Sequence, residues 1–427
     1  MKYLIAAAGL AAVVSSPAMA ATRQQYSAFA RDRNVSVSER AHPEYAPLNI
    51  RWESLVIQPE LDVSLEGSDN IYATETNTKS DFDLKIKPQV TLTSDWSRNE
   101  FGAYVRGSYD NYFTYTSENA PQAGVGAHFR LDTLPNSSVT LTGEYSNNVE
   151  SRESTNYAQN LAKPLRNESF QAALNSVTEI NRFRYSLSAG GEVLTYQSGK
   201  LKSGGSFDVS GYNRSWATVD GEVEYAINPG TAVYSYIGLN ERAYDHNDPG
   251  QSRNSKGFDV ALGTNFDITR LVRGDVRIGY LEQYYVAKVP AVGGLSLRAT
   301  VEYFPTQLTT IKLQAVRAVQ DTDQPDASSY VTEYISGRID HELFRNIILS
   351  ASIEGGQDTY NGICGTPGCT YGRHDDRWDT TFGVNYLMNR RVGLNLAFTH
   401  ENLTSSGPNR TLGHSSNMLL LTTVLRY

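Results

Sequence analysis

Two short groups of residues have the types that hydrolytic chemistry requires. His374 precedes Asp375 and Asp376, and His400 precedes Glu401. A histidine next to a carboxylate can act as a general base, provided that a nucleophile lies within its reach. Neither group belongs to a recognisable catalytic motif. We therefore interpret both as solvated loop charge and expect that the protein is not an enzyme; a surface hydrolase is the alternative that these residues would have to support.

Metal ions have few ligands in this sequence. Only 7 His and 2 Cys occur among 427 residues, so a zinc site is not expected. Two acidic segments offer the oxygen ligands that calcium prefers, but neither has a complete ligand pattern. The first contains Asp245, Asn247 and Asp248, and the second contains Asp321, Asp323 and Asp326. We expect neither a metal nor a cofactor.

The first twenty residues have the layout of a secretory signal. Lys2 precedes an apolar run over residues 4–14, and small residues end the segment before Ala21. This order predicts an exported protein that is cleaved before Ala21. Export leads to a compartment in which disulfides persist. Cys364 and Cys369 bracket a turn-forming Gly-Thr-Pro-Gly segment, so we expect a disulfide between them, with two free thiols as the alternative.

The elements that carry the remaining charges alternate between apolar and polar residues. In residues 61–65, Leu, Val and Leu occupy every second position, with Asp and Ser between them. A period of two is typical of a β-strand with one apolar face and one polar face. About 18 such segments follow one another from residue 55 onward. Those centred near residues 236, 315 and 335 are ambiguous in face, so we expect about 16 to 18 strands.

The connections between these segments alternate between short and long. Tight turns occur at 134–137, 227–231, 304–307 and 388–391. Long polar connections occur at 147–167, 197–213, 244–254, 320–328, 358–377 and 402–415. A soluble sandwich has no reason to separate the two kinds, whereas an outer-membrane barrel has short periplasmic turns and long extracellular loops. The sequence therefore predicts an all-β fold, a transmembrane antiparallel up-and-down β-barrel, over residues 55–427.

The composition excludes two other classes of protein. After the signal, no apolar run approaches the roughly 18 residues that a membrane-spanning helix needs. The chain has 38 Lys and Arg against 46 Asp and Glu, a net charge of −8, so we expect no basic face for nucleic acid. We expect the barrel to be surrounded by outer-membrane lipid.

The end of the chain predicts how the barrel closes. Leu419, Leu421, Leu425 and Tyr427 share one parity in the last strand. Such a strand would be an aggregation hazard as a free edge, so we expect it to pair with the first strand. A closing strand with a terminal aromatic residue resembles the signal that barrel-assembly machinery reads, and this resemblance assigns that role to Leu425 and Tyr427.

Residues 21–54 form a polar leader on the periplasmic side of the expected barrel. Arginines recur in it, and apolar residues are few, so we do not expect it to fold alone. Three roles are open. The leader is a disordered tether, or it enters the lumen as a plug, or it docks a periplasmic partner.

Charged residues with the parity opposite to the apolar ones are expected inside the barrel. A barrel of about 18 strands is wide enough to hold water, so charges can remain there without the cost of a dry core. The candidates are Lys85, Lys87, Arg106, Glu144, Arg184, Glu222, Glu224, Arg277, Arg298 and Glu302. They either solvate the lumen and pair with one another, or the arginines among them set a field for an anionic solute.

The 27 tyrosines suit two places in such a barrel. Those with lipid-facing parity near strand ends are expected in an interfacial aromatic girdle. These are Tyr109, Tyr145, Tyr225, Tyr280, Tyr303 and Tyr386. Others lie inward or near loop bases, where rings could stack on sugars, with packing as the alternative. These are Tyr104, Tyr112, Tyr115, Tyr284 and Tyr285.

Three stretches near the start of the expected barrel carry a family resemblance. They are residues 43–51, 55–59 and 68–72, with weaker echoes at 253–258 and 305–310. They resemble the opening pattern of the putative beta-barrel porin 2 family, although Ala46, Asn49 and Ser68 depart from it. The resemblance implies an outer-membrane barrel of a Gram-negative bacterium that is often associated with exopolysaccharide or capsule export. It brings no catalytic residues with it.

Two functions follow from these expectations. The first is a conduit for exopolysaccharide, which periplasmic export proteins would hand on. The alternative is a general or solute-specific diffusion porin. The barrel rests on the sequence pattern, whereas the cargo rests on the family resemblance alone.

Overall fold

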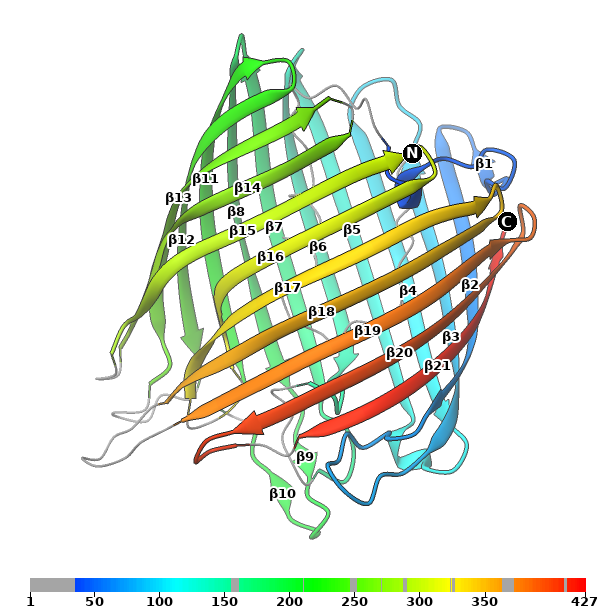
Figure 1. Ribbon diagram of the computed structural model, residues 1–427, viewed down its shortest axis with the longest axis vertical. Coiled ribbons are helices and arrows are strands. Elements are labelled where there is room, and N and C mark those ends of the chain that lie inside the picture. The colour runs from blue at the N-terminus through cyan, green and yellow to red at the C-terminus, as the bar shows by residue number, and fades with distance from the viewer. Residues whose placement is uncertain are drawn as a thin grey trace.

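The computed structural model describes residues 35–154, 161–209, 211–245, 252–269, 271–286, 290–322, 324, 327–362, 372–410 and 413–427. The expected signal sequence, Cys364 and Cys369 lie outside the described residues. Within them, one antiparallel sheet closes on itself into a barrel (Figure 1). This confirms the predicted fold class.

Eighteen strands form the wall of the barrel. They are β2 (Leu55–Ser68), β3 (Asp81–Ser94), β4 (Glu100–Tyr112), β5 (Ala120–Leu134), β6 (Ser137–Val149), β7 (Arg166–Ile180), β8 (Phe183–Tyr196), β11 (Arg214–Asn228), β12 (Thr231–Tyr244), β13 (Ser255–Ile268), β14 (Val272–Tyr285), β15 (Val292–Thr306), β16 (Thr309–Gln320), β17 (Ala327–Phe344), β18 (Ile347–Gly362), β19 (Arg373–Leu387), β20 (Val392–Ser406) and β21 (His414–Arg426). Each strand pairs with the next one in this order, and β21 closes the barrel on β2.

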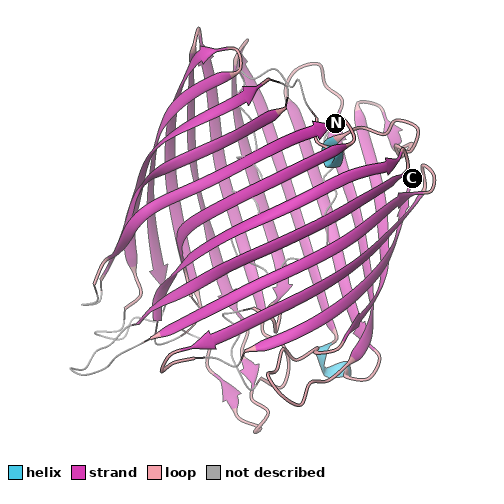
Figure 2. Ribbon diagram, viewed as in Figure 1, coloured by secondary structure: helices cyan, strands magenta, loops and turns pink. Residues whose placement is uncertain are grey.

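Five smaller elements lie outside the wall: β1 (Ile50–Trp52), which pairs with β2, the hairpin of β9 (Gly199–Lys200) and β10 (Ser206–Phe207), and the short 3-10 helices η1 (Val37–Glu39) and η2 (Thr116–Glu118). Figure 2 shows strand throughout the wall, with η1 and η2 at opposite ends of the barrel. No helix in the described part of the chain is long and apolar enough to cross a membrane.

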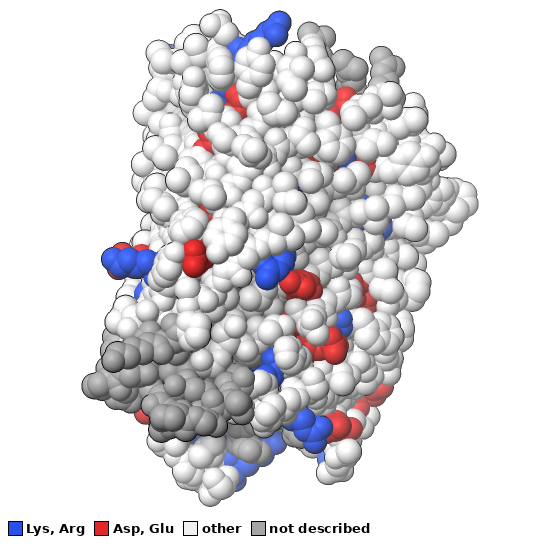
Figure 3. Space-filling model, turned by 60° about the vertical axis from the view of Figure 1, so that its left-hand side comes forward, with Lys and Arg blue, Asp and Glu red and all other residues white. Residues whose placement is uncertain are grey.

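Large apolar side chains remain exposed on the outside of the wall. Val105, Leu262 and Ile335 are 61%, 68% and 69% exposed. They share one parity with their apolar neighbours, because successive side chains of a strand point to opposite faces. Uncharged atoms dominate the face drawn in Figure 3. Lipid is the solvent that makes such a surface favourable, and a closed barrel leaves no backbone edge exposed to it.

Short turns join the strands at one end of the barrel and longer loops join them at the other. Two residues, Asn181 and Arg182, connect β7 to β8, and Asn181 adopts the left-handed conformation (φ 57°) that tight hairpins favour. By contrast, residues 197–213 connect β8 to β11. The first described residues and the C-terminal end of β21 lie at the turn end (Figure 1), which is periplasmic in barrels of this kind.

The strands extend further toward the outside than the sequence pattern predicts. Residues 373–376 were expected in a loop, but they begin β19, where His374 pairs in register with Ser406 of β20. Both strands have 15 residues, more than the roughly 9–11 that cross a bilayer. Beyond the lipid, apolar alternation is no longer required, so strand pairing continues without its sequence signal.

Exposed tyrosines lie on the outer face of the wall near both ends of the strands. Tyr225 and Tyr303, near the periplasmic strand ends, are 37% and 43% exposed on the outer face. Tyr109 and Tyr145, near the extracellular strand ends, are 42% and 43% exposed there. Rings at both levels match the interfacial girdles of outer-membrane barrels.

Candidate functional site

The inner face of the wall is polar and is the candidate site. In each strand that contributes a buried charged side chain, that side chain points to the face opposite to the apolar residues. Examples are Asp83, Arg184, Glu224, Arg273, Arg277, Glu302, Asp340, Glu342, Asp358, Arg373 and Asp375. Because the sheet is closed, all of these side chains face a common interior.

Arg106 and Glu144 lie on the inner face, as expected, and form one ion pair. Nη2 of Arg106 is 2.7 Å from Oε1 of Glu144. The Arg106 guanidinium lies 5.5 Å from the ring centroid of Tyr104, another expected inner residue. Gly126 makes room for that ring, since a Cβ there would lie 2.6 Å from it. The three side chains thus form one packed group that spans β4 and β6.

Arg277 and Arg298 lie side by side in β14 and β15, where they form a register pair. Arg277 contacts Asp259 at 3.4 Å and lies 3.9 Å from the ring centroid of Tyr236. Arg298 has inward parity and remains exposed to the lumen. Two cations are thus adjacent here. The contacts of Arg277 are to a carboxylate and to an aromatic face.

Two further expected cations have acidic partners. Arg184 lies 3.8 Å from Glu179 and 4.0 Å from Glu224. Lys85 lies 3.0 Å from Glu66 and 3.8 Å from Asp83. The structure thus supports charge pairing for these two positions over a field of unpaired cations.

Three further expected charges lie on the same inner face. Glu302 contacts Arg273 at 2.7 Å, and Lys87 is the register partner of Asp62 across β2 and β3. Glu222 is two residues before Glu224 in β11 and shares its inward parity. All ten charged residues proposed for the lumen therefore lie on the inner side of the wall.

The five tyrosines proposed for sugar contact lie in three different places. Tyr104, Tyr112 and Tyr285 have inward parity and are half-buried. Tyr115 lies in the loop after β4, with its ring centroid 5.4 Å from that of Tyr72. Tyr284 is 50% exposed on the outer face.

Of the two placements expected for these tyrosines, Tyr284 has the one near a loop base, at the extracellular end of β14, and it does not point inward. Its ring centroid lies 6.5 Å from that of Phe258, on the lipid side. Consecutive residues of a strand cannot share a face, so Tyr285 takes the inner position and Tyr284 the outer one.

Inner tyrosines of β12 were missed by the sequence pattern. Tyr234 Oη donates to Asp275 at 2.9 Å, and Tyr236 Oη donates to Asp220. Both rings are 7% exposed. Tyr is apolar enough to pass for a lipid-facing residue, so the face of this strand was ambiguous; its neighbours Val233 and Ile237, which point outward, carry the signal that would have settled it.

Arginines on β17 and β19 also meet carboxylates. Arg338 contacts Asp340 at 2.8 Å, and Arg373 contacts Asp375 at 2.5 Å. In both cases the partners are two residues apart and therefore share the inner face. The Arg-x-Asp spacing is a signal that could have predicted this pairing.

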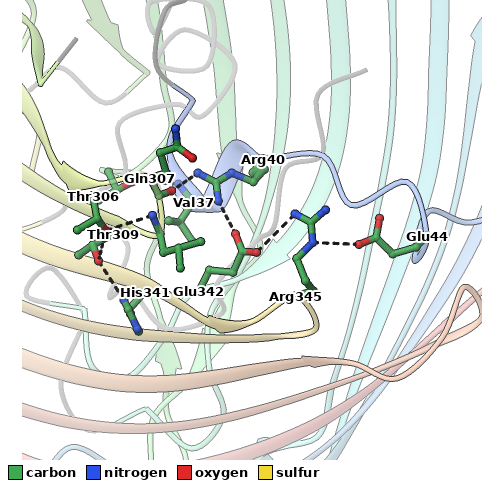
Figure 4. Close-up of polar contacts among 11 residues, drawn as sticks. Val37, Arg40, Glu44, Thr306, Gln307, Thr309, His341, Glu342 and Arg345 are labelled. Carbon is green, nitrogen blue, oxygen red and sulfur yellow. Dashed lines mark hydrogen bonds and ion pairs between the residues drawn. The ribbon is translucent and has the colours of Figure 1, made fainter. Parts of the chain in front are cut away.

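The described end of the leader lies in the periplasmic mouth of the barrel, against β14 to β17. Figure 4 shows its contacts with residues of β15 to β17 and of the turns beside them. The backbone N–H of Val37 donates to Thr310 Oγ1 at 3.0 Å. Oε2 of Glu39 accepts from Arg273 at 2.8 Å. The pKa of Glu39 lies below its ordinary value: withdrawal from water opposes ionisation, but the hydrogen bond and the charge of Arg273 outweigh it.

Two further ion pairs hold the same segment (Figure 4). Arg40 contacts Glu342 at 2.5 Å, and it also donates to the carbonyl oxygen of Gln307. Arg345, in the turn between β17 and β18, lies 3.7 Å from Glu44 and 3.8 Å from Glu342. Leader and wall therefore alternate in charge along this contact.

A loop carboxylate enters the lumen near its extracellular end. Glu153, in the loop after β6, lies within electrostatic reach of Glu66, Asp379 and Glu401 of the wall, with Lys85 as the nearby cation. Withdrawal from water, followed by repulsion from Glu66, raises the pKa of Glu153 to about 7. Glu153 and Glu401 share a hydrogen bond, which requires that one of them carries the proton.

His374 and His400, the two candidate residues for hydrolysis, lie on the outer face. His374 Nδ1 is 3.3 Å from Thr359 Oγ1, and the ring of His400 lies 4.8 Å from that of Trp378. Asp375 points to the other side of the wall, where Arg373 and Ser405 bind it. His374 and Asp375 are thus separated by the sheet.

The acidic segments proposed for calcium are only partly described, because Asn247, Asp248, Asp323 and Asp326 lie outside the described residues. Asp321 contacts Arg242 at 3.2 Å. Among the residues whose positions are described, no group of three or more His, Cys, Asp or Glu is arranged to hold a metal ion.

Solved structures of similar fold include three proteins of Pseudomonas aeruginosa. The chain is 11% identical to OpdK of Pseudomonas aeruginosa, over 87% of this chain and 99% of that one, with a TM-score of 0.46. It is 13% identical to OpdO of Pseudomonas aeruginosa, over 91% and 100%, with a TM-score of 0.47. It is 8% identical to the siderophore receptor PirA of Pseudomonas aeruginosa, over 86% and 80%, with a TM-score of 0.46.

No curated protein matches the sequence. The family described as putative beta-barrel porin 2 matches residues 42–426. The match covers the whole wall of the barrel, from β2 to β21. The chain is therefore a porin-type channel of the Gram-negative outer membrane and belongs to the putative beta-barrel porin 2 family.

Proposed function

We propose that the channel conducts a hydrophilic, hydroxyl-rich polymer, and that its cargo is exopolysaccharide on its way to the cell surface. Such a cargo needs a hydrated passage whose walls offer hydrogen bonds. It has no need for a strong field of one sign. We further infer that periplasmic export proteins deliver the polymer and that barrel-assembly machinery inserts the barrel.

Charge pairing along the inner face is the observation that supports this proposal best. The Arg106–Glu144, Arg277–Asp259 and Arg373–Asp375 pairs lie at 2.7, 3.4 and 2.5 Å. Paired charges cancel one another's field at a distance but keep donors and acceptors for hydrogen bonds. A neutral or weakly charged saccharide would meet polar contacts in such a lumen without electrostatic trapping.

Aromatic rings are a weaker support for saccharide as the cargo. Tyr104, Tyr112 and Tyr285 are half-buried, so part of each side chain faces the lumen. The Tyr236 ring, by contrast, is covered by Arg277. Sugar stacking is therefore proposed for the first three residues alone.

Surface polysaccharide in a gene-deletion strain tests the cargo. We expect the deletion to abolish polymer at the cell surface and the wild-type gene to restore it. A Tyr104→Ala, Tyr112→Ala and Tyr285→Ala variant should restore it only in part, whereas Tyr284→Ala, on the outer face, serves as the matched control. Unchanged surface polymer in the deletion strain would refute the export of this cargo.

A diffusion porin for small solutes is the second candidate. The adjacent cations Arg277 and Arg298 favour it, since a local pair of arginines suits small anions. This function predicts steady conductance in planar bilayers and solute uptake by cells that lack any export partner. Uptake that is independent of polysaccharide genes would favour the porin over the conduit.

A further inference from the structure

Residues 36–44, here named the latch segment, enter the periplasmic mouth and contact the inner wall. Ser36 and Val37 are 2% and 1% exposed. The segment then follows the rim, where Arg390 donates to the carbonyl oxygen of Glu44. Just after the segment, the backbone N–H of Asn49 donates to the carbonyl oxygen of Tyr427. The segment is therefore anchored at both of its ends, with its first residues inside the lumen.

Both glutamates and the arginine of the latch segment meet an opposite charge. Glu39 binds Arg273 of β14, Arg40 binds Glu342 of β17, and Glu44 faces Arg345 of the following turn. The partners come from separate places along the chain, and Arg40 and Glu342 are 302 residues apart. A tether without a fixed position has no reason to match charge at three such points.

The latch segment contacts the wall mainly through hydrogen bonds that water could otherwise make, and not by packing into an apolar core. Val37 donates its N–H to Thr310, and Gln307 accepts from Arg40. Val37 is its one fully buried apolar side chain. If the segment leaves, water can take over these hydrogen bonds, so the free energy that holds it is small compared with that of a packed core.

We propose that the latch segment is a releasable closure that narrows the periplasmic mouth while it is seated and widens the mouth when it leaves. The proposal rests on the channel function but not on the identity of the cargo. Of the three roles that the sequence leaves open for the leader, this is the plug. The ion pairs determine for what fraction of the time the latch segment is seated in the mouth.

Channel recordings in planar bilayers test the closure directly. Residues 36–44 are replaced by a Gly-Ser linker of equal length, which keeps the reach of the leader but removes its charges. We expect single-channel conductance at least to double, because the mouth loses its occupant. A linker variant with the conductance of the wild type would overturn the proposal.

A double-mutant cycle on Arg40 and Glu342 tests whether the ion pair holds the closure. Arg40→Gln should raise the fraction of time spent in the larger conductance state. The same change in a Glu342→Gln background should add much less, because the pair is already broken and only the hydrogen bond of Arg40 to Gln307 is left to lose. Arg51→Gln is the matched control, since Arg51 is also a leader arginine in an ion pair but contacts Asp95 on the exposed rim.

Two results would overturn the role of the pair. One is that Arg40→Gln behaves like the wild type, and the other is that Arg40→Gln and Arg51→Gln open the channel equally. Heat-dependent mobility on gels checks that every variant is a folded barrel. If no variant conducts, including the linker variant, the channel function itself fails, and this outcome differs from a conducting barrel whose linker variant is unchanged.

Discussion

The two mouths of the barrel each receive a segment of the chain, but the charges that meet there differ. At the periplasmic mouth, Glu39 and Arg40 face opposite charges on Arg273 and Glu342. At the extracellular mouth, Glu153 faces carboxylates. The first contact is therefore stabilised when its groups are ionised, and the second is stabilised when a proton is bound. The two ends should respond to acid in opposite directions.

The largest expected effect comes from removing the cation at the periplasmic mouth. Arg273 is 5% exposed and contacts both Glu39 and Glu302. Arg273→Ala leaves these two carboxylates without that partner, which should lower the free energy of unfolding by about 3 kcal/mol and release the latch segment.

Denaturant unfolding in lipid vesicles, followed by tryptophan fluorescence, measures the loss of stability. Arg51→Ala should change it little, since both partners of its pair are exposed. Equal losses in the two variants would show that the contact in the mouth has no special strength.

The next effect is the response of the periplasmic mouth to acid. The lowered pKa of Glu39 means that its ionised form stabilises the seated state. That contribution is complete above the ordinary pKa of a glutamate and is lost as pH falls through the lowered value. Channel conductance should therefore rise at strongly acidic pH.

Glu39→Gln should conduct more than the wild type at neutral pH and lose part of the acid response. Arg273 of β14 and Lys312 of β16 face Glu39 and remain charged throughout this range. Glu302 and Glu342 face the latch segment as well, through the ion pairs with Arg273 and Arg40. A Glu39→Gln variant with an unaltered acid response would contradict this assignment.

The response of the extracellular mouth has the opposite sign. Because the pKa of Glu153 is raised to about 7, the inward position of its loop is favoured below that pH and is penalised as pH rises through it. The groups that face Glu153 are Glu66 of β2, Lys85 of β3, Asp379 of β19 and Glu401 of β20. Current fluctuations from loop movement should increase between pH 6 and 8, on the order of the titration range of one group.

Glu153→Gln imitates the protonated form, so its current fluctuations should be small at both ends of this pH range. The same substitution at Glu118, which Arg152 neutralises at 2.5 Å, is a control in a neighbouring loop. If Glu153→Gln fluctuates with pH as the wild type does, the carboxylate group at this mouth is not the origin of the effect.

The smallest effect concerns the middle of the lumen, between the two mouths. Arg106→Gln leaves Glu144 without its cation and should shift ion selectivity modestly toward cations. Adding Glu144→Gln should restore the original selectivity. Reversal potentials in a salt gradient measure both, and a shift that persists in the double variant would count against charge pairing as the principle of this lumen.

The sequence predicts the wall of the barrel well because lipid imposes a period of two on every strand. Ambiguity arose where that constraint weakens. Tyrosines such as Tyr234 suit either face, and residues 373–376 continue a strand beyond the lipid. In both cases the local sequence lacks the apolar contrast that marks a face or a boundary.

The charge pairs of the lumen could be predicted only in part. Side chains two residues apart, such as Arg338 and Asp340, share a face by geometry alone. Arg40 and Glu342, however, meet because the barrel brings the leader to β17, and no local pattern contains that contact. The position of the latch segment therefore cannot be predicted from the individual strands; it depends on how the strands are arranged in the closed barrel.

The seam between β2 and β21 has a consequence for how the molecule is made. Leu61 pairs with Leu425, so the ring is sealed by joining the first wall strand to the last one. Until that contact forms, both strands have unsatisfied edges, and the contact spans nearly the entire chain. A nascent polypeptide must consequently be kept from sticking to its neighbours until translation has delivered its final residues, and a truncation of β21 would leave an open sheet in place of a smaller pore.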